Sequence, residues 1–294
     1  MGHNDVMRTG ARLGRPLRLG GAVAGCAALA ACTVLSGADR LSVREDPETP
    51  LPGRDGGGPV DADRDAAPAS DAGPLPLTDA ATEPCDEPGL LAWWRFDEGA
   101  GDVVHDCTSY GHDGRLDGGT WIAGKRGGAL SFDGGWVGFG DPAALRVTGP
   151  LTVTAWIREE RTDSPETQYI VSRRADGNSG GGWRFATEPP ALTMSVVPGL
   201  DASFTETKGG SVGGNTWVHV AAVFEPGQAV SLYVGGTREA RRTTNIPAAL
   251  VQPPAEVRVG ARGDGAYPFV GAIDDVRIYG RALDEAEIAA LATP

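Results

Sequence analysis

The 294-residue sequence contains few cysteines, few histidines and few basic residues. There are four cysteines and four histidines, and 39 aspartate and glutamate residues outnumber 26 lysine and arginine residues. This shortage of positive charge excludes nucleic acid as an expected partner, because contacts with phosphates need clustered Lys and Arg side chains. The His-Glu-x-x-His and Walker motifs are absent too, so these two classes of enzyme are not expected.

Long hydrophobic runs are missing as well. The apolar stretch Leu19–Ala31 is too short to span a bilayer, which takes about 20 helical residues. It follows an arginine-rich start and has the length of the apolar region of a secretory signal peptide. The sequence Leu29-Ala-Ala-Cys32 resembles the lipobox of bacterial lipoproteins, in which the cysteine is acylated and begins the mature chain. Cys26 fits the same pattern with a shorter apolar region, and an ordinary secretory peptide cut near Cys32 is the alternative.

We therefore predict a lipoprotein signal peptide over residues 1–31 and a lipid anchor on Cys32. Two acyl chains on one cysteine give durable membrane attachment. Thr33 follows the cysteine, which in lipoprotein sorting favours the outer membrane. The expected location is the bacterial cell envelope, with the membrane contacted through the lipid only, or the outside of the cell after secretion.

Residues 32–88 differ from the rest in being rich in Asp, Ala, Pro and Gly. Such a segment buries too little apolar surface to offset the loss of chain entropy on ordering, so we predict a disordered acidic linker. Repulsion between its like charges extends the chain, and it would hold the following domain on the order of tens of ångströms from the membrane.

Residues 89–294 consist of short runs rich in β-branched and aromatic residues, separated by Gly, Pro, Asn and Asp. Many short strands punctuated by turns indicate an all-β sandwich or barrel. No helical pattern of 10–15 residues lies between the runs, which argues against a parallel α/β fold. The predicted strands lie at 90–96, 129–132, 136–139, 151–158, 169–172, 182–185, 191–197, 217–224, 230–234, 256–260 and 269–279.

The last predicted strand is followed by the signal for a short helix. Strand alternation gives one mainly apolar face, expected to pack inward, which contains Ala272, Asp274, Val276 and Ile278. Asp274 alone interrupts it, and a carboxylate there must be paired, bound to a cation or placed at the rim. Asp284 is the expected N-cap of the helix, with Glu287 as its capping-box partner.

Seven segments of this region carry a family resemblance. They are Trp93–Gly99, Asp106–Gly114, Gly128–Gly134, Leu151–Trp156, Trp217–Ala221, Leu232–Gly236 and Gly271–Tyr279. In this order they resemble the laminin G-like jelly-roll domains of bacterial surface proteins, within the concanavalin A-like lectin and glucanase superfamily. The resemblance covers residues 89–294 and implies two stacked antiparallel sheets, adjacent first and last strands and a C-terminal helix. It departs at Gly235-Gly236, where the family has Asn-Gly, although both suit a type I′ hairpin turn.

Cys85 and Cys107 are the cysteines that remain after removal of the signal peptide. They lie on either side of the first strand, and in an exported protein such a pair is expected to form a disulfide. Closing a loop of about 23 residues would stabilise the domain by ~3 kcal/mol. Two free thiols or a metal-binding pair are the alternative.

Four aspartates belong to the motifs that the resemblance singles out, and they are Asp97, Asp106, Asp133 and Asp274. If the first and last strands pair, Asp97 and Asp274 approach each other, and two adjacent carboxylates repel unless a cation bridges them. We therefore predict one structural Ca²⁺ site, because calcium prefers several oxygen ligands. In the alternative interpretation these side chains cap turns or pair with Arg95 and Arg277.

The expected function is a non-catalytic binding module for glycans or surface proteins, assisted by calcium. Aromatic rings can stack on sugars, and Trp183, in a glycine-rich run, is the best surface candidate among the seven tryptophans. No strand carries the Glu-x-Asp-x-Glu pattern that the glucanases of the superfamily share, so we do not predict an enzyme. A polysaccharide hydrolase or lyase with an unfamiliar active site and a purely structural surface protein are the alternatives.

Overall fold

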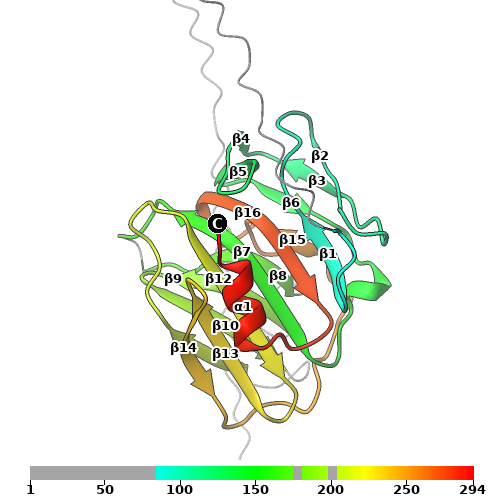
Figure 1. Cartoon of the computed structure of the whole chain (residues 1–294), viewed down its shortest axis with the longest axis vertical. Coiled ribbons are helices and arrows are strands. Elements are labelled where there is room, and N and C mark those ends of the chain that lie inside the picture. Colours follow the sequence, from blue (N-terminus) through cyan, green and yellow to red (C-terminus); the bar gives the residue numbers. More distant parts are fainter. Residues whose placement is uncertain (1–83, 164, 175–180, 198–203) are drawn as a thin grey trace, which may run out of the picture. The chain divides into compact units, whose positions relative to one another are not determined.

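The computed structural model describes residues 84–163, 165–174, 181–197 and 204–294 (Figure 1). The predicted signal peptide, the predicted lipid anchor at Cys32 and nearly all of the predicted linker lie outside these residues. Within them, no helix is long and apolar enough to cross a membrane.

The described domain is a sandwich of two eight-stranded antiparallel sheets, as the sequence predicts. Sheet A has the order β14-β13-β12-β7-β16-β5-β4, with β1 also paired to β16. Its strands are β1 (Leu90–Trp94), β4 (Thr120–Ala123), β5 (Gly128–Asp133), β7 (Leu151–Glu159), β12 (Val218–Glu225), β13 (Ala229–Val234), β14 (Thr237–Arg242) and β16 (Val270–Tyr279).

Sheet B stacks on sheet A and has the order β11-β10-β9-β8-β15-β6-β3-β2. Its strands are β2 (Val103–Val104), β3 (Gly114–Asp117), β6 (Trp136–Gly138), β8 (Gln168–Arg174), β9 (Gly182–Glu188), β10 (Ala191–Val197), β11 (Thr205–Gly209) and β15 (Val257–Val259). A 3₁₀ turn, η1 (Ala143–Leu145), precedes β7.

The main core lies between the sheets and is built from alternate residues of facing strands. On β7 these are Leu151, Val153, Ala155 and Ile157, all fully buried as the alternation predicts. Phe185 of β9 and Met194 of β10 are among their counterparts on sheet B. Removal of this apolar surface from water is the main force that holds the two sheets together.

The predicted neighbourhood of the first and last strands is confirmed, because β1 pairs antiparallel with β16 over Leu90↔Tyr279 and Trp94↔Val276. A second apolar cluster covers the outer side of sheet A around Trp93 and Tyr279. Helix α1 (Glu285–Leu291) packs there through Ile288 and lies across sheet A in Figure 1.

The ends of α1 and of the β13–β14 hairpin follow the predicted local chemistry. Asp284 is the N-cap, and its side chain and that of Glu287 form the predicted capping box. Gly235 and Gly236 have φ values of 58° and 81°, which are the two left-handed positions that a type I′ turn requires.

The simple alternation predicted for β16 is wrong at its centre. The pairing of β16 with β7 shifts register between Asp274 and Arg277, and Asp275 has a positive φ of 51°. This bulge places Ile273 in the main core together with Val276 and Ile278, although strict alternation would separate them. Asp274 therefore lies at the bulge, where it does not interrupt an apolar inward face.

Candidate functional site

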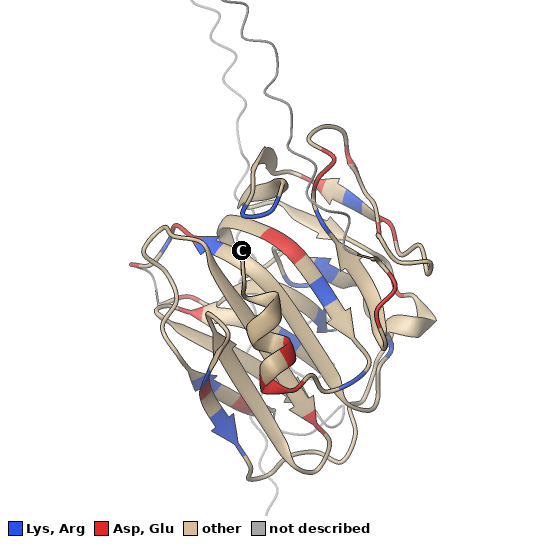
Figure 2. Ribbon diagram, viewed as in Figure 1, with Lys and Arg blue, Asp and Glu red and all other residues tan. Residues whose placement is uncertain are grey.

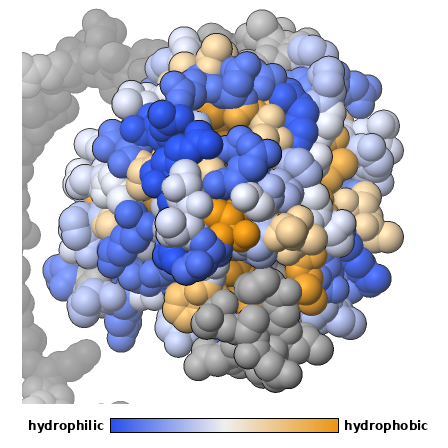
Figure 3. Space-filling model, turned by 90° about the horizontal axis from the view of Figure 1, so that it is seen from below, coloured by the Kyte–Doolittle hydropathy of each residue, from blue (hydrophilic) through white to orange (hydrophobic). Residues whose placement is uncertain are grey.

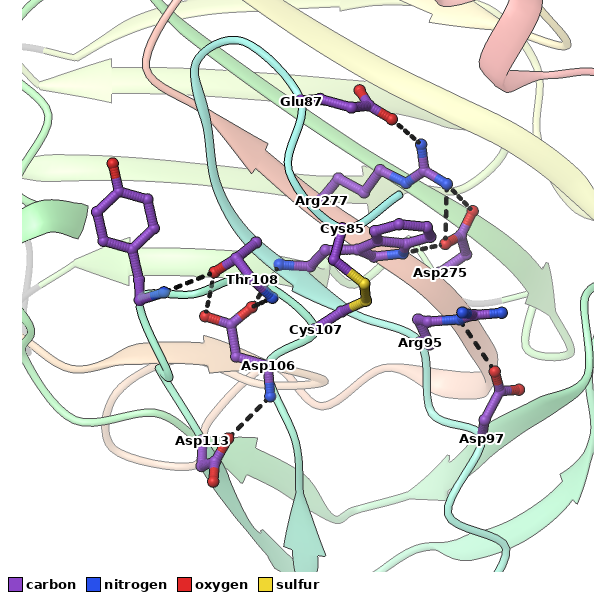
Figure 4. The surroundings of a disulfide bond; sticks show 12 residues. Cys85, Glu87, Arg95, Asp97, Asp106, Cys107, Thr108, Asp113, Asp275 and Arg277 are labelled. Atoms are coloured by element: carbon purple, nitrogen blue, oxygen red, sulfur yellow. Dashed lines mark hydrogen bonds and ion pairs between the residues drawn. A yellow bond between two sulfur atoms is a disulfide. The ribbon is translucent and has the colours of Figure 1, made fainter. Parts of the chain in front are cut away.

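Cys85 and Cys107 form the predicted disulfide, which ties the segment before β1 to the loop that follows β2 (Figure 4). The Cα atoms are 5.4 Å apart, and the backbone N–H of Cys107 donates to the carbonyl of Trp93 at 2.9 Å. The disulfide thus fixes the start of the domain against the strand that pairs with β16.

Asp106, one of the four predicted calcium ligands, holds the loop between β2 and β3. Its Oδ1 accepts from the backbone N–H groups of Trp93 (3.0 Å) and Thr108 (2.9 Å). Its Oδ2 accepts from the Thr108 hydroxyl (2.8 Å) and from the backbone N–H of His112 (2.9 Å). Figure 4 shows Asp106 turned towards Thr108 and Asp97 turned towards Arg95. The carboxylate of Asp106 therefore caps a turn, which was the alternative interpretation.

Asp97 and Asp274 bind the same short loop, between β4 and β5, from two sides. Asp97 accepts from the backbone N–H of Gly128 at 2.7 Å and pairs with Arg95 at 3.1 Å. Asp274 accepts through Oδ2 from the backbone N–H groups of Lys125 (2.7 Å) and Arg126 (2.9 Å). The strand pairing thus brings these two carboxylates to one loop, as predicted, but backbone donors occupy them.

The four predicted aspartates do not gather at one point. Asp133 is exposed at the end of β5. Across the described ranges, no group of three or more His, Cys, Asp or Glu side chains is arranged to hold a metal ion. The residues therefore do not fit a four-carboxylate calcium site, and calcium binding stays a prediction.

The bulge of β16 concentrates buried charge (Figure 2). Arg277 is 1% exposed, lies over the ring of Trp93 at 3.8 Å and pairs with Asp275 at 3.4 Å. Asp274 is fully buried, and its Oδ1 has no hydrogen-bond partner. Burial raises the pKa of Asp274 to about 8, and the adjacent charge of Asp275 adds to this effect. Asp274 thus keeps its proton to a higher pH than an exposed aspartate does.

Trp183 does not lie on the surface, so the prediction that it stacks on a ligand is wrong. Its side chain is 1% exposed and belongs to the main core beside Phe185. The strand was predicted correctly, but its inward face is the one that carries Trp183. The next residue, Arg184, points outward on sheet B and pairs across the strands with Ser172.

Sheet B carries a row of alternating cations and aromatic rings on its outer side. The guanidinium of Arg262 lies 4.7 Å from the ring of Tyr267, and this ring stacks on Tyr169 at 5.4 Å. Arg184 lies 5.5 Å from the ring of Tyr169 and 6.0 Å from that of Phe204. We call Tyr169, Arg184, Phe204, Arg262 and Tyr267 the tyrosine–arginine surface.

Two members of this surface are large apolar side chains that remain accessible. Phe204 is 52% exposed and Tyr267 43% exposed, and in the described part of the chain only Tyr110 matches them. On the face drawn in Figure 3, apolar residues reach solvent in patches between hydrophilic ones. Tyr267 has a φ of 56°, an uncommon conformation for a bulky residue that marks many ligand-binding positions.

A cavity of about 490 Å³ opens beside Tyr267, between the β7–β8 loop and the β15–β16 loop. This volume lies in the range of small-molecule binding sites. The cavity is lined by Arg161, Pro165, Glu166, Thr167, Arg262, Ala266, Tyr267 and Pro268.

Sequence reasoning missed this surface because its members come from distant parts of the chain. Tyr169 and Tyr267 meet because β8 pairs with β15, which precedes the loop that carries Tyr267. The available signal was local: a Tyr-Pro pair in a glycine-containing loop that also carries Arg262. That signal indicates a loop, but it does not show what the loop covers.

Comparison with known families gives one match. Residues 132–289 match the family described as the concanavalin A-like lectin/glucanases superfamily. A comparison with curated proteins gives no match.

Solved structures with the same fold include two binding domains and a domain of an arabinanase. The binding domain of Paraclostridial Mosquitocidal Protein 1 aligns with a TM-score of 0.56 at 13% identity, over 70% of this chain and 52% of that one. The Botulinum Neurotoxin serotype G binding domain gives 0.54 at 12% identity, over 69% and 50%. This chain thus spans about half the length of these two domains.

The third structure is domain 4 of AbnA, a GH43 extracellular arabinanase from Geobacillus stearothermophilus, in complex with arabinotriose. It aligns with a TM-score of 0.51 at 21% identity, over 69% of this chain and 98% of that domain. At sequence identities this low, the structural match shows a shared fold alone.

Proposed function

This chain belongs to the concanavalin A-like lectin/glucanases superfamily, and we propose that it is a non-catalytic module of the bacterial cell envelope that binds a glycan through the tyrosine–arginine surface. A surface protein is the second class of partner that the fold accommodates. The observation that supports the glycan is the exposed pair of Tyr267 and Phe204 with Arg184 and Arg262 beside them.

The surface presents aromatic rings and guanidinium groups, and a sugar can interact with both. The C–H faces of a sugar ring are apolar and pack on aromatic rings, while its hydroxyl groups accept hydrogen bonds from guanidinium groups. Rings held between cations are rigid, so a ligand that docks on them loses little side-chain entropy of the protein. The arabinotriose complex of the arabinanase domain and the binding domains of the two toxins support a binding function for this fold.

A glycan array probed with the full chain tests the proposal, with Tyr267→Ala and Tyr110→Ala compared on every glycan that binds. Tyr110 is 54% exposed, lies in the loop between β2 and β3 and stacks on His112, so it is a matched control outside the proposed surface. We expect Tyr267→Ala to weaken binding at least about tenfold and Tyr110→Ala to leave it unchanged. Binding that survives the Tyr267 change would place the ligand elsewhere, and binding to envelope proteins only would favour the second class of partner.

The lipid anchor on Cys32 is part of the proposal, because it would keep the module at the membrane. Metabolic labelling with a tagged fatty acid tests it directly in the producing bacterium. We expect label in the full chain and none in Cys32→Ser, with Cys26→Ser labelled like the parent. Equal labelling of Cys32→Ser and the parent would contradict the assignment.

Assistance by calcium remains the other expectation to test. We expect calcium to raise the melting temperature of the full chain and Asp274→Asn to remove this rise. A melting temperature that is the same in calcium and in chelator would end this part of the proposal.

A further inference from the structure

We propose that the cavity beside Tyr267 receives an anionic group of the ligand, a carboxylate or a sulfate carried by a sugar. This inference deepens the proposed function and rests on it, because it names the class of glycan that the tyrosine–arginine surface prefers. It is carried by the charges that line the cavity and by one buried cation, Arg174, near Tyr169 on the same sheet.

The two loops that form the cavity each contribute an arginine. Arg161 follows β7 and Arg262 follows β15, and both line the same space of about 490 Å³ as Tyr267. A sugar whose ring rests against Tyr267 would therefore carry its substituents between two guanidinium groups. Guanidinium forms bidentate, charge-assisted hydrogen bonds with planar carboxylates and with sulfate-like oxygen arrays.

Arg161 has no carboxylate partner among the residues that the structure describes. Its guanidinium makes one long contact, from Nη2 to the carbonyl of Pro268 at 3.4 Å, and its Nε has no partner. Glu159 is nearby and buried; burial raises its pKa, and the charge of Arg161 lowers it in part. Its Oε1 already accepts a hydrogen bond from Gln168 at 2.9 Å.

Two guanidinium groups and one carboxylate line the cavity. Asp264 is bound to the guanidinium of Arg262 through both oxygens, which lowers the pKa of Asp264 to about 2. Glu166 is the only carboxylate among the lining residues. When Asp264 is counted, Arg161 and Arg262 are matched by two carboxylates. The excess positive charge then comes from a third arginine.

That third arginine is Arg174, at the end of β8. It is 6% exposed, its Nε has no hydrogen-bond partner, and it forms no ion pair with a carboxylate in the described parts of the chain. It pairs across the strands with Gly182, two residues from Arg184 and on the same face of sheet B. Burial lowers the pKa of Arg174, the neighbouring charges of Arg184 and Arg262 lower it further, and its interaction with Tyr169 offsets part of this.

A buried cation without a counterion is unfavourable, and an arginine cannot relieve this by losing its proton. Three guanidinium groups gather around Tyr169 and Tyr267: Arg184 pairs with Glu188 and Glu206, Arg262 pairs with Asp264, and Arg174 has no carboxylate partner among the described residues. The group around these rings therefore lacks one counterion, that of Arg174. An acidic sugar would supply it, whereas a neutral sugar would leave the excess in place.

Three polysaccharides that share one backbone test the inference on the full chain. Chondroitin carries a carboxylate, chondroitin sulfate carries a carboxylate and a sulfate, and carboxyl-reduced chondroitin carries neither. We expect the full chain to bind at least one charged form at least about tenfold more tightly than the neutral form. The preference should fall as salt is raised, because the interaction is between charges.

Arg161→Gln and Arg174→Gln should each remove most of this preference, and Arg161→Lys should restore part of it. Arg115→Gln is the control, since Arg115 lies on β3 of the same sheet, away from the cavity, and pairs with Asp102 at 2.6 Å. Melting curves in the absence of ligand identify any variant that fails to fold. If the buried Arg174→Gln variant does not fold, the result for Arg161→Gln tests the inference.

The outcomes separate this inference from the proposed function. Loss of the preference in Arg161→Gln with unchanged binding of neutral glycans supports the inference. Equal binding of charged and neutral glycans, abolished by Tyr267→Ala, would overturn the inference and leave the proposed function standing. A charge preference that survives both Arg161→Gln and Arg174→Gln would overturn the inference as well.

Discussion

The buried carboxyl group of Asp274 gives the domain a specific pH dependence. Its pKa is raised from 3.8 to about 8 by burial, so the folded state keeps a proton that the unfolded chain releases. The stability that this group contributes is therefore present at low pH and is lost as the pH rises through about 8. Replacement of Asp274 by Asn, which is neutral at every pH, should remove this dependence.

His219 changes the stability of the domain with pH in the opposite direction. It therefore determines the pH range in which the effect of Asp274 can be measured. Burial, with Arg277 and Arg126 nearby, lowers the pKa of His219 from 6.5 to about 3. The stability from His219 is present above pH 6.5 and is lost as the pH falls towards 3. The two effects oppose each other below pH 6.5, and of these two groups only Asp274 contributes between pH 6.5 and 8. Over these 1.5 pH units its contribution falls by roughly 2 kcal/mol.

Urea unfolding followed by tryptophan fluorescence, at intervals from pH 6 to 9, measures the effect. We expect the free energy of unfolding of the parent to fall by roughly 2 kcal/mol between pH 6.5 and 8. The curve for Asp274→Asn should be flat there, and the exposed control Asp133→Asn should follow the parent. A parent curve that is flat, or an Asp274→Asn curve as steep as that of the parent, would show that Asp274 is not the source of the pH dependence.

Three further predictions concern stability. Replacing both Cys85 and Cys107 by Ser should lower the free energy of unfolding by about 3 kcal/mol, and a reducing agent should have no effect on that variant. Trp183→Phe should cost about 2 kcal/mol by leaving a cavity in the core while glycan binding is unchanged; loss of binding without loss of stability would contradict its buried position. Asp284→Ala should cost about 1 kcal/mol through loss of the N-cap, and an unchanged urea midpoint would show that the cap contributes nothing.

Much of the fold follows from local patterns in the sequence. The long buried strands β7, β10, β12 and β16 all coincide with predicted strands, because alternating apolar residues must face a core. The strands that were missed are β2, β3, β4, β11 and β14. Four of them lie at the ends of the sheet orders, where one side of the strand is unpaired and polar residues are favoured.

The candidate site was harder to predict because it depends on which face of each strand turns inward. A single bulge at Asp274 and Asp275 reverses which residues of β16 face the core. The alternation of apolar and polar residues in the sequence does not indicate where such a bulge occurs. The same ambiguity misplaced Trp183, whose neighbour Arg184 is the residue that faces outward. Local chemistry, such as the capping box of Asp284 and the disulfide of Cys85, was predictable because it needs no knowledge of distant strands.

The proposed glycan site is tested most directly by locating the bound ligand on the protein without mutation. Titration of a glycan identified on the array into the isotope-labelled full chain, followed by NMR, reports which backbone amides change their environment. If the glycan binds the tyrosine–arginine surface, the largest chemical shift changes should fall on the amides of Tyr267, Arg262 and Arg184. Shifts confined to the Cys85–Cys107 disulfide or to α1 would contradict it.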